Sequence, residues 1–235
     1  TDGGLEVVNQ LYMHSTKAGS PENLPVEVRY RLVDHALSVG DITLAATMMA
    51  SLPQPPEGEG YFDWQMRKAR VLILEGEYEK GEAELRMSLQ GITELNADMI
   101  DRYLQVVFDL QTIKRHEQAL ALFDLLPIAA LDDKLRREIY YWKAESSYEL
   151  ERYDQAALLY MKSAKAGDET MSDLWAQSAR FKASDALLKA GLYDDAQYAY
   201  AELLRITSSD SRKRLIRQKL QHIRLLRSSD TESAG

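Results

Sequence analysis

Apolar and polar positions follow the spacing of helix faces along most of the chain. Small or apolar residues recur at offsets of three, four and seven, which places them on one side of an α-helix. Short turns interrupt this pattern five times, so it predicts five pairs of helices. The first helices are expected at about 25–39, 60–75, 95–113, 132–150 and 171–190. The second helices are expected at about 41–52, 78–90, 116–126, 153–166 and 193–206.

The five pairs line up when the last residue of each turn is taken as an anchor. These anchors are Ile42, Tyr78, His116, Tyr153 and Tyr193, with spacings of 36, 38, 37 and 40 residues. Three positions after each anchor stands a small residue, namely Ala45, Gly81, Ala119, Ala156 and Ala196. Seven positions after it stands a larger one, namely Met49, Leu85, Phe123, Tyr160 and Tyr200. Small residues let two helices approach closely, so the recurrence predicts antiparallel helical hairpins.

The recurring residues resemble the tetratricopeptide repeat (TPR) family. The fourth pair matches best, through Tyr140, Ala144, Tyr153, Ala156 and Tyr160. The first three pairs depart more, because Gly81 replaces an alanine and the spacing exceeds the family's usual length. The resemblance covers about 25–206 and implies a right-handed α-solenoid that binds proteins. It implies an architecture more strongly than any particular partner.

The expected fold is therefore all-α, a right-handed α-solenoid of about five TPR-like hairpins with a helix at either end. Residues 1–24 are expected to hold an N-terminal helix, at 5–18, which is either a cap or the remnant of an upstream repeat. The expected repeats span about 25–56, 57–92, 93–129, 130–168 and 169–207. A basic capping helix at 208–227 and a flexible tail at 228–235 complete the chain.

Composition agrees with a helical protein and removes several kinds of chemistry. Only 12 glycines and 6 prolines occur in 235 residues, which disfavours a turn-rich all-β fold. The chain has 0 cysteines, so thiol catalysis, Cys-ligated zinc and disulfides are excluded. No apolar stretch has the length of a transmembrane helix.

Catalytic and ligand motifs are not found. His116 and Glu117 begin like a zinc-protease helix, but Leu120 stands where the second histidine is needed. No phosphate loop, dinucleotide fingerprint or nucleophile elbow occurs. We therefore expect no enzyme activity, no catalytic, cofactor-binding or metal-binding residues, no cofactor and no small-molecule substrate.

A partner-binding groove is expected on the first helices, because these line the concave face of a helical solenoid. Residues at matching offsets predict an aromatic floor with acidic walls, suited to a basic or amphipathic segment of a partner protein. The predicted groove residues are Asp34, Arg70, Phe108, Glu138, Tyr141, Glu145, Tyr148, Glu149, Phe181, Asp185 and Lys189. The alternative is that these acids only solubilise the surface and that the aromatic residues belong to the core.

The net charge of −8 hides a basic segment at 212–227. Its seven bases are Arg212, Lys213, Arg214, Arg217, Lys219, Arg224 and Arg227. The segment is interpreted as a cap that packs Ile216, Leu220 and Ile223 against the fifth hairpin. Alternatively it binds an anionic membrane surface or a nucleic acid, or mediates self-association into a homo-oligomer. The overall acidity argues against nucleic acid.

The function expected from these patterns is a non-catalytic protein–protein interaction scaffold or adaptor. The turns of the last two hairpins are similar to those of bacterial envelope TPR proteins. That resemblance implies a periplasmic location within an assembly or secretion system, and a cytoplasmic location is the alternative.

Overall fold

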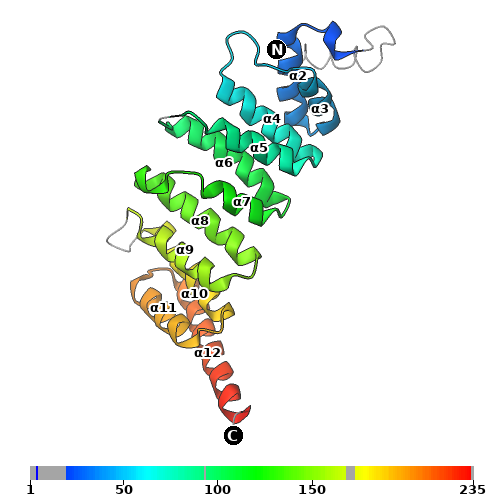
Figure 1. The fold of residues 1–235 in the computed structure, drawn as a ribbon. Helices are drawn as coiled ribbons and strands as arrows, with labels where there is room; N and C mark the ends of the chain where they lie inside the picture. Colours follow the sequence, from blue (N-terminus) through cyan, green and yellow to red (C-terminus); the bar gives the residue numbers. More distant parts are fainter. Residues whose placement is uncertain (1–3, 5–19, 93, 168–172, 234–235) are drawn as a thin grey trace. The chain divides into compact units, whose positions relative to one another are not determined.

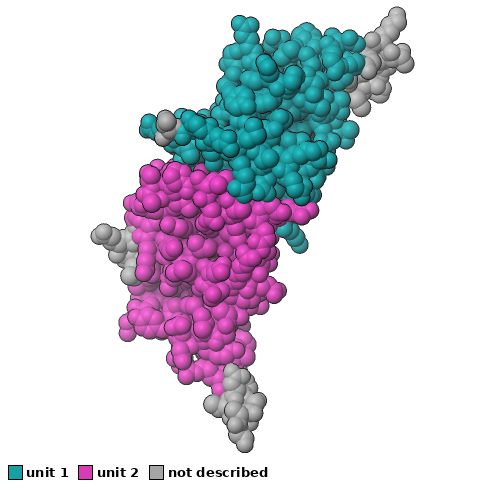
Figure 2. Space-filling model, in the orientation of Figure 1, with its two compact units in different colours: residues 1–114 teal, residues 115–235 magenta. Residues whose placement is uncertain are grey.

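All secondary structure in the described part of the chain is helical. The computed structural model describes residues 4, 20–92, 94–167 and 173–233. These contain eleven α-helices, two short 3-10 helices and no strand. The chain divides into two compact units, Thr1–Lys114 (unit 1) and Arg115–Gly235 (unit 2), which Figure 2 colours separately. The predicted all-α class is confirmed, whereas the helix expected at 5–18 lies outside the described residues.

Unit 1 contains two hairpins and one further helix, preceded by a 3-10 turn at Pro21–Asn23 (Figure 1). Its helices are α2 (Val26–Val39), α3 (Ile42–Ala50), α4 (Tyr61–Glu75), α5 (Tyr78–Ser88) and α6 (Ala97–Thr112). Within each hairpin α2 packs on α3 and α4 on α5, and α4 also contacts α3 and α6. Thus α2, α4 and α6 are the predicted first helices of this unit.

Unit 2 repeats this arrangement (Figure 1), with a second 3-10 turn at Ile128–Ala130. Its helices are α7 (His116–Phe123), α8 (Asp133–Glu149), α9 (Tyr153–Lys165), α10 (Leu174–Lys189), α11 (Tyr193–Ile206) and α12 (Asp210–Ser233). Helix α8 packs on α9 and α10 on α11, and successive pairs meet through α9 with α10 and α11 with α12. The boundary between the units falls in the turn of the third predicted hairpin, between α6 and α7.

The five predicted turns share one backbone conformation. Their first residues all have positive φ, at 77° for Gly40, 98° for Gly76, 63° for Lys114, 59° for Glu151 and 74° for Gly191. Glycine adopts this left-handed conformation without steric cost, and it commonly ends helices. The turn positions predicted from the sequence are therefore confirmed, including the two that lack glycine.

Glu151→Gly is expected to raise the free energy of unfolding by about 0.5 kcal/mol. A side chain at positive φ is strained by about 1–2 kcal/mol, and the extra backbone freedom of glycine in the unfolded chain offsets part of this relief. Gly191→Ala, at the equivalent turn, should destabilise the protein. Chemical denaturation monitored by circular dichroism would measure both variants, and a destabilised Glu151→Gly would contradict this account.

The small and large residues that follow each anchor form the interior of the hairpins. Ala45, Ala119, Ala156 and Ala196 are completely buried, and Gly81 is buried as well. Among the larger residues, Tyr160 and Tyr200 are also fully enclosed. In the four hairpins that lie within one unit, these residues are enclosed where the first and second helices pack on each other.

The last helix is longer than the sequence pattern indicates. The basic helix was expected to end at Arg227, with a flexible tail from 228, but α12 continues to Ser233. No glycine or proline occurs between 208 and 234, so nothing in the backbone ends the helix there. Polarity alone was therefore a poor indicator of where α12 stops.

Candidate functional site

The eleven predicted groove residues all lie on first helices. Asp34, Arg70 and Phe108 are on α2, α4 and α6 of unit 1. The other eight are in unit 2, on α8 (Glu138, Tyr141, Glu145, Tyr148 and Glu149) and on α10 (Phe181, Asp185 and Lys189). Each unit therefore has its own candidate surface, formed by its first helices.

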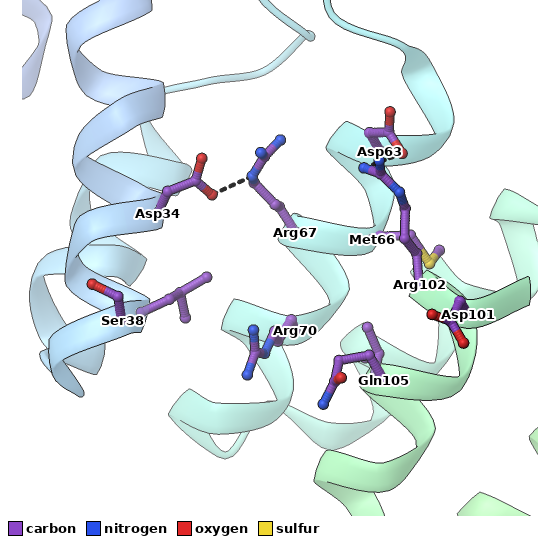
Figure 3. A pocket seen from close by; sticks show the side chains of 11 residues that line it. Asp34, Ser38, Asp63, Met66, Arg67, Arg70, Asp101, Arg102 and Gln105 are labelled. Carbon is purple, nitrogen blue, oxygen red and sulfur yellow. Dashed lines mark hydrogen bonds and ion pairs between the residues drawn. The ribbon is translucent and has the colours of Figure 1, made fainter. Parts of the chain in front are cut away.

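In unit 1 the faces of α2, α4 and α6 surround a hollow of about 570 Å³. Figure 3 shows that three arginines, Arg67, Arg70 and Arg102, gather here from α4 and α6. Asp34, Asp63 and Asp101 line the same hollow, whose apolar part comes from Leu37, Met66 and Val106. Its formal lining charge is therefore balanced.

The arginines of this hollow are held in ion pairs. Arg67 contacts Asp34, and the Arg102 guanidinium lies 3.0 Å from Asp63. Arg70 Nε donates to Asp109 Oδ2 at 2.8 Å. Burial raises the pKa of Asp109 above its ordinary value, although the charge of Arg70 opposes this shift. Because each guanidinium already has a carboxylate partner, the hollow provides little free positive charge for a ligand.

In unit 2 the predicted acidic wall takes part in the packing of the hairpins. Glu145 accepts a hydrogen bond from the Tyr160 hydroxyl, and Lys182 Nζ lies 2.9 Å from Glu145 Oε1. Burial raises the pKa of Tyr160, and the hydrogen bond to Glu145 raises it further. Burial by itself would lower the pKa of Lys182, but its bond to Glu145 and the charge of that carboxylate raise it overall.

The next hairpin repeats this arrangement of tyrosine, acid and lysine. The Tyr200 hydroxyl donates to Asp185 Oδ1 at 2.7 Å, and Lys219 of α12 forms an ion pair with the same carboxylate. In both cases the tyrosine comes from the second helix of the same hairpin and the lysine from the next helix pair. Glu145 therefore joins two successive hairpins, and Asp185 joins the last hairpin to α12.

Two of the bases in these interhelical ion pairs occupy the same position of the repeat pattern, which was not considered in predicting the groove. Arg67 and Lys182 each stand eleven positions before their anchors, and their acids, Asp34 and Glu145, stand eight before the preceding anchors. Comparing the residues eleven positions before each anchor with those eight positions before the preceding anchor would have shown this pairing. The other predicted charges, Glu138, Glu149 and Lys189, have no ion pair within the described residues.

A second hollow, of about 380 Å³, lies among α8, α10 and α12. Its apolar lining is Tyr141, Phe181 and Leu215, so two predicted floor residues do come together. Its polar lining in the described part of the chain is Ser178, Lys182, Ser209, Ser211 and Arg212, with no carboxylate. Except for Arg212, these polar residues were missed, because their proximity depends on where α12 docks.

The basic helix α12 has two different faces. Its apolar residues Ile216 and Ile223 are completely buried against α11, as the interpretation as a cap predicts. Bases on the same side contact the body: Arg212 with Gln177 and Ser178, Lys219 with Asp185, and Arg227 with Asp194 and Gln197. The structure shows no ion pair with described residues for Lys213, Arg214, Arg217 and Arg224.

Searches for other kinds of site add little. The described residues contain no cluster of three or more side chains able to hold a metal ion. Within the same residues, no helix has the length and apolar character needed to cross a bilayer. A scan against protein-family models matches no family. A search of curated proteins finds no match.

Proposed function

We propose that this chain is a non-catalytic interaction scaffold whose hairpins follow one another as a right-handed, TPR-like α-solenoid. Three features support the proposal: five turns of one conformation, small residues at the helix contacts, and ion pairs that join successive hairpins. In helical repeats, first helices present a shared surface on which extended or helical segments bind. A setting in the bacterial envelope remains a prediction from the resemblance.

The hollow of unit 2 is the surface that best fits this function. Its size is within the range of pockets that bury a ligand side chain, and its apolar floor is flanked by polar groups that can fix orientation. The expectation of a basic partner rested on free acids on the first helices. Because Glu145 and Asp185 are already paired, and Glu138 and Glu149 do not line the hollow, the proposed binding surface is the apolar floor together with its neighbouring polar groups.

Random-peptide display on the full chain tests this proposal, followed by affinity measurements on one matched pair of variants. Leu215 lines the hollow and is 42% exposed, whereas Leu225 lies outside it on the same helix and is 62% exposed. Leu215→Ser should weaken selected peptides about fivefold, the result of losing roughly 1 kcal/mol of apolar contact. Leu225→Ser should leave their affinity unchanged.

Two results would contradict the proposal. One is that no peptide is enriched above a non-binding control protein. The other is that the selected peptides respond equally to both leucine substitutions, or respond instead to Tyr198→Ala. Tyr198 is an aromatic residue on the second helix α11, is 70% exposed and does not line the hollow.

A further inference from the structure

We infer that the unit 2 hollow selects an anionic group, a carboxylate or a phosphate, carried beside an apolar side chain. The inference rests on the proposed function, because it names the chemistry of the segment that this same hollow would bind. It reverses the charge expected of the partner from the sequence alone.

The first support is the sign of the charge in the hollow. Lys182 and Arg212 line it and no Asp or Glu among the described residues does, although the whole chain carries −8. The charge of Lys182 is met by Glu145. Among the described residues Arg212 has only neutral partners, since its guanidinium donates to Gln177 Oε1 at 3.2 Å and to Ser178 Oγ at 3.1 Å. Its positive charge is therefore not compensated by a carboxylate.

The second support is the number of donors that converge with Arg212. A guanidinium has five N–H donors in a planar fork that suits carboxylate and phosphate oxygens, and two of its hydrogen bonds are accounted for. Neutral acceptors hold the fork in place without cancelling its charge. Ser209 and Ser211, at the start of α12, add hydroxyls to the same lining, and because these lie 2.9 Å apart, one hydroxyl donates to the other and the pair contributes a single further donor. Asp210 stands between them in sequence, but it is exposed and does not line the hollow.

The third support is the apolar floor next to these donors. Tyr141 and Phe181 are packed against neighbouring tyrosines, with ring centroids 5.5 Å from Tyr160 and 5.7 Å from Tyr200 respectively, so the floor is fixed. Leu215 is more exposed and completes the floor on the α12 side. A bare anion would leave this apolar surface exposed to water, so the matching ligand carries an apolar side chain beside the charge.

Four synthetic peptides test the inference directly. Each is a fluorescein-labelled glycine peptide with one test residue between two leucines, the test residue being glutamate, phosphoserine, glutamine or lysine. Fluorescence anisotropy with the full chain should rank the glutamate or phosphoserine peptide at least about tenfold tighter than the glutamine and lysine peptides. Whichever acidic peptide binds more tightly identifies the carboxylate or the phosphate as the preferred source of charge.

Arg212→Gln and Arg217→Gln form the matched pair of variants. Both remove one positive charge from α12, but only Arg212 lines the hollow, and Arg217 is exposed and has no ion pair within the described residues. Arg212→Gln should abolish the preference for the acidic peptides, whereas Arg217→Gln should retain it. Thermal melting checks that both variants fold, and if Arg212→Gln does not, the ranking on the unaltered chain decides.

Failures of the inference and of the proposed function look different. If the glutamine or lysine peptide binds as tightly as the acidic ones, anion selection is wrong but segment binding stands. If both arginine variants lose the preference equally, the attraction is a general effect of charge and the inference is wrong. If none of the four peptides binds, the assignment of this hollow as a segment-binding site fails together with the inference.

Discussion

Tyr160→Ala is expected to lower the free energy of unfolding of unit 2 by about 4 kcal/mol, as measured by chemical denaturation. The ring is completely buried and packs edge-on against Tyr141. Truncating a buried aromatic side chain typically costs about 3–5 kcal/mol, from lost transfer energy and the cavity left behind. The loss of the hydrogen bond to Glu145 adds to this.

Tyr160→Phe separates the hydroxyl from the ring. It retains the packing and removes only the donor to Glu145, whose carboxylate keeps its contact with Lys182. A hydrogen bond to a charged group contributes about 1.5–3 kcal/mol, and Glu145 is partly exposed to solvent, so we expect a loss near the lower limit. Tyr200→Phe, which removes the equivalent bond to Asp185, should cost a similar amount.

Hydrogen exchange read separately for the described residues of unit 1 (20–92 and 94–114) and of unit 2 (115–167 and 173–233) would show where the destabilisation acts. Exchange should accelerate in unit 2 and not in unit 1 for Tyr160→Ala. Tyr198→Ala is the control, because this exposed residue should change stability by less than about 0.5 kcal/mol. Equal losses for Tyr160→Phe and Tyr160→Ala would show that ring packing contributes little, contrary to our account.

Gly81→Ala is expected to destabilise unit 1 by about 1 kcal/mol, although alanine stands at the equivalent position of the other four hairpins. A Cβ at residue 81 would lie 2.6 Å from Ile73 Cγ1 and 3.0 Å from the carbonyl oxygen of Ala69. The higher helix propensity of alanine contributes about 1 kcal/mol in the opposite direction. Overpacking costs about 1–3 kcal/mol, and we expect it to prevail because Ile73 is itself enclosed.

A double-mutant cycle with Ile73→Ala tests the cause of this effect. Ile73→Ala is destabilising by itself, because it empties a buried site. In that background Gly81→Ala should cost less than it does in the unaltered chain, since the closest clashing atom is gone. Additive losses in denaturation experiments would mean that the contact with Ile73 is not the source of the strain.

The helices and turns could be predicted because their signals are local. A small residue three positions after each anchor and a left-handed residue before it suffice to place each hairpin, even where Lys114 and Glu151 replace glycine. Gly81, which departs from the alanine pattern, stands where a Cβ would come too close to Ile73 on the other helix of the hairpin. Patterns that depend on one hairpin alone were therefore reliable.

The roles of the charged residues could not be predicted in the same way. Whether Glu145 faces a groove or a lysine depends on how α10 is registered against α8, and that is a property of two hairpins together. Likewise, the contribution of Arg212 to the unit 2 hollow depends on where α12 docks, some 35 residues from Gln177. Acids that recur at one position of the repeat pattern indicate a binding surface only after the bases that recur at neighbouring positions have been considered.

One side of α12 differs from the side by which α10 packs on its own second helix. Lys219 of α12 contacts Asp185 as Lys182 of α10 contacts Glu145, which aligns residue 219 of α12 with residue 182 of α10. In α10 the side facing its own second helix carries Ser184, Leu187 and Leu188, whereas the corresponding residues of α12 are Gln221, Arg224 and Leu225. Gln221 and Arg224 therefore place long polar side chains where α10 has a serine and a leucine, and Leu225 is exposed. In unit 2 this side of α12 is therefore poorly suited to burying the face of another helix, which is the property expected of a capping helix.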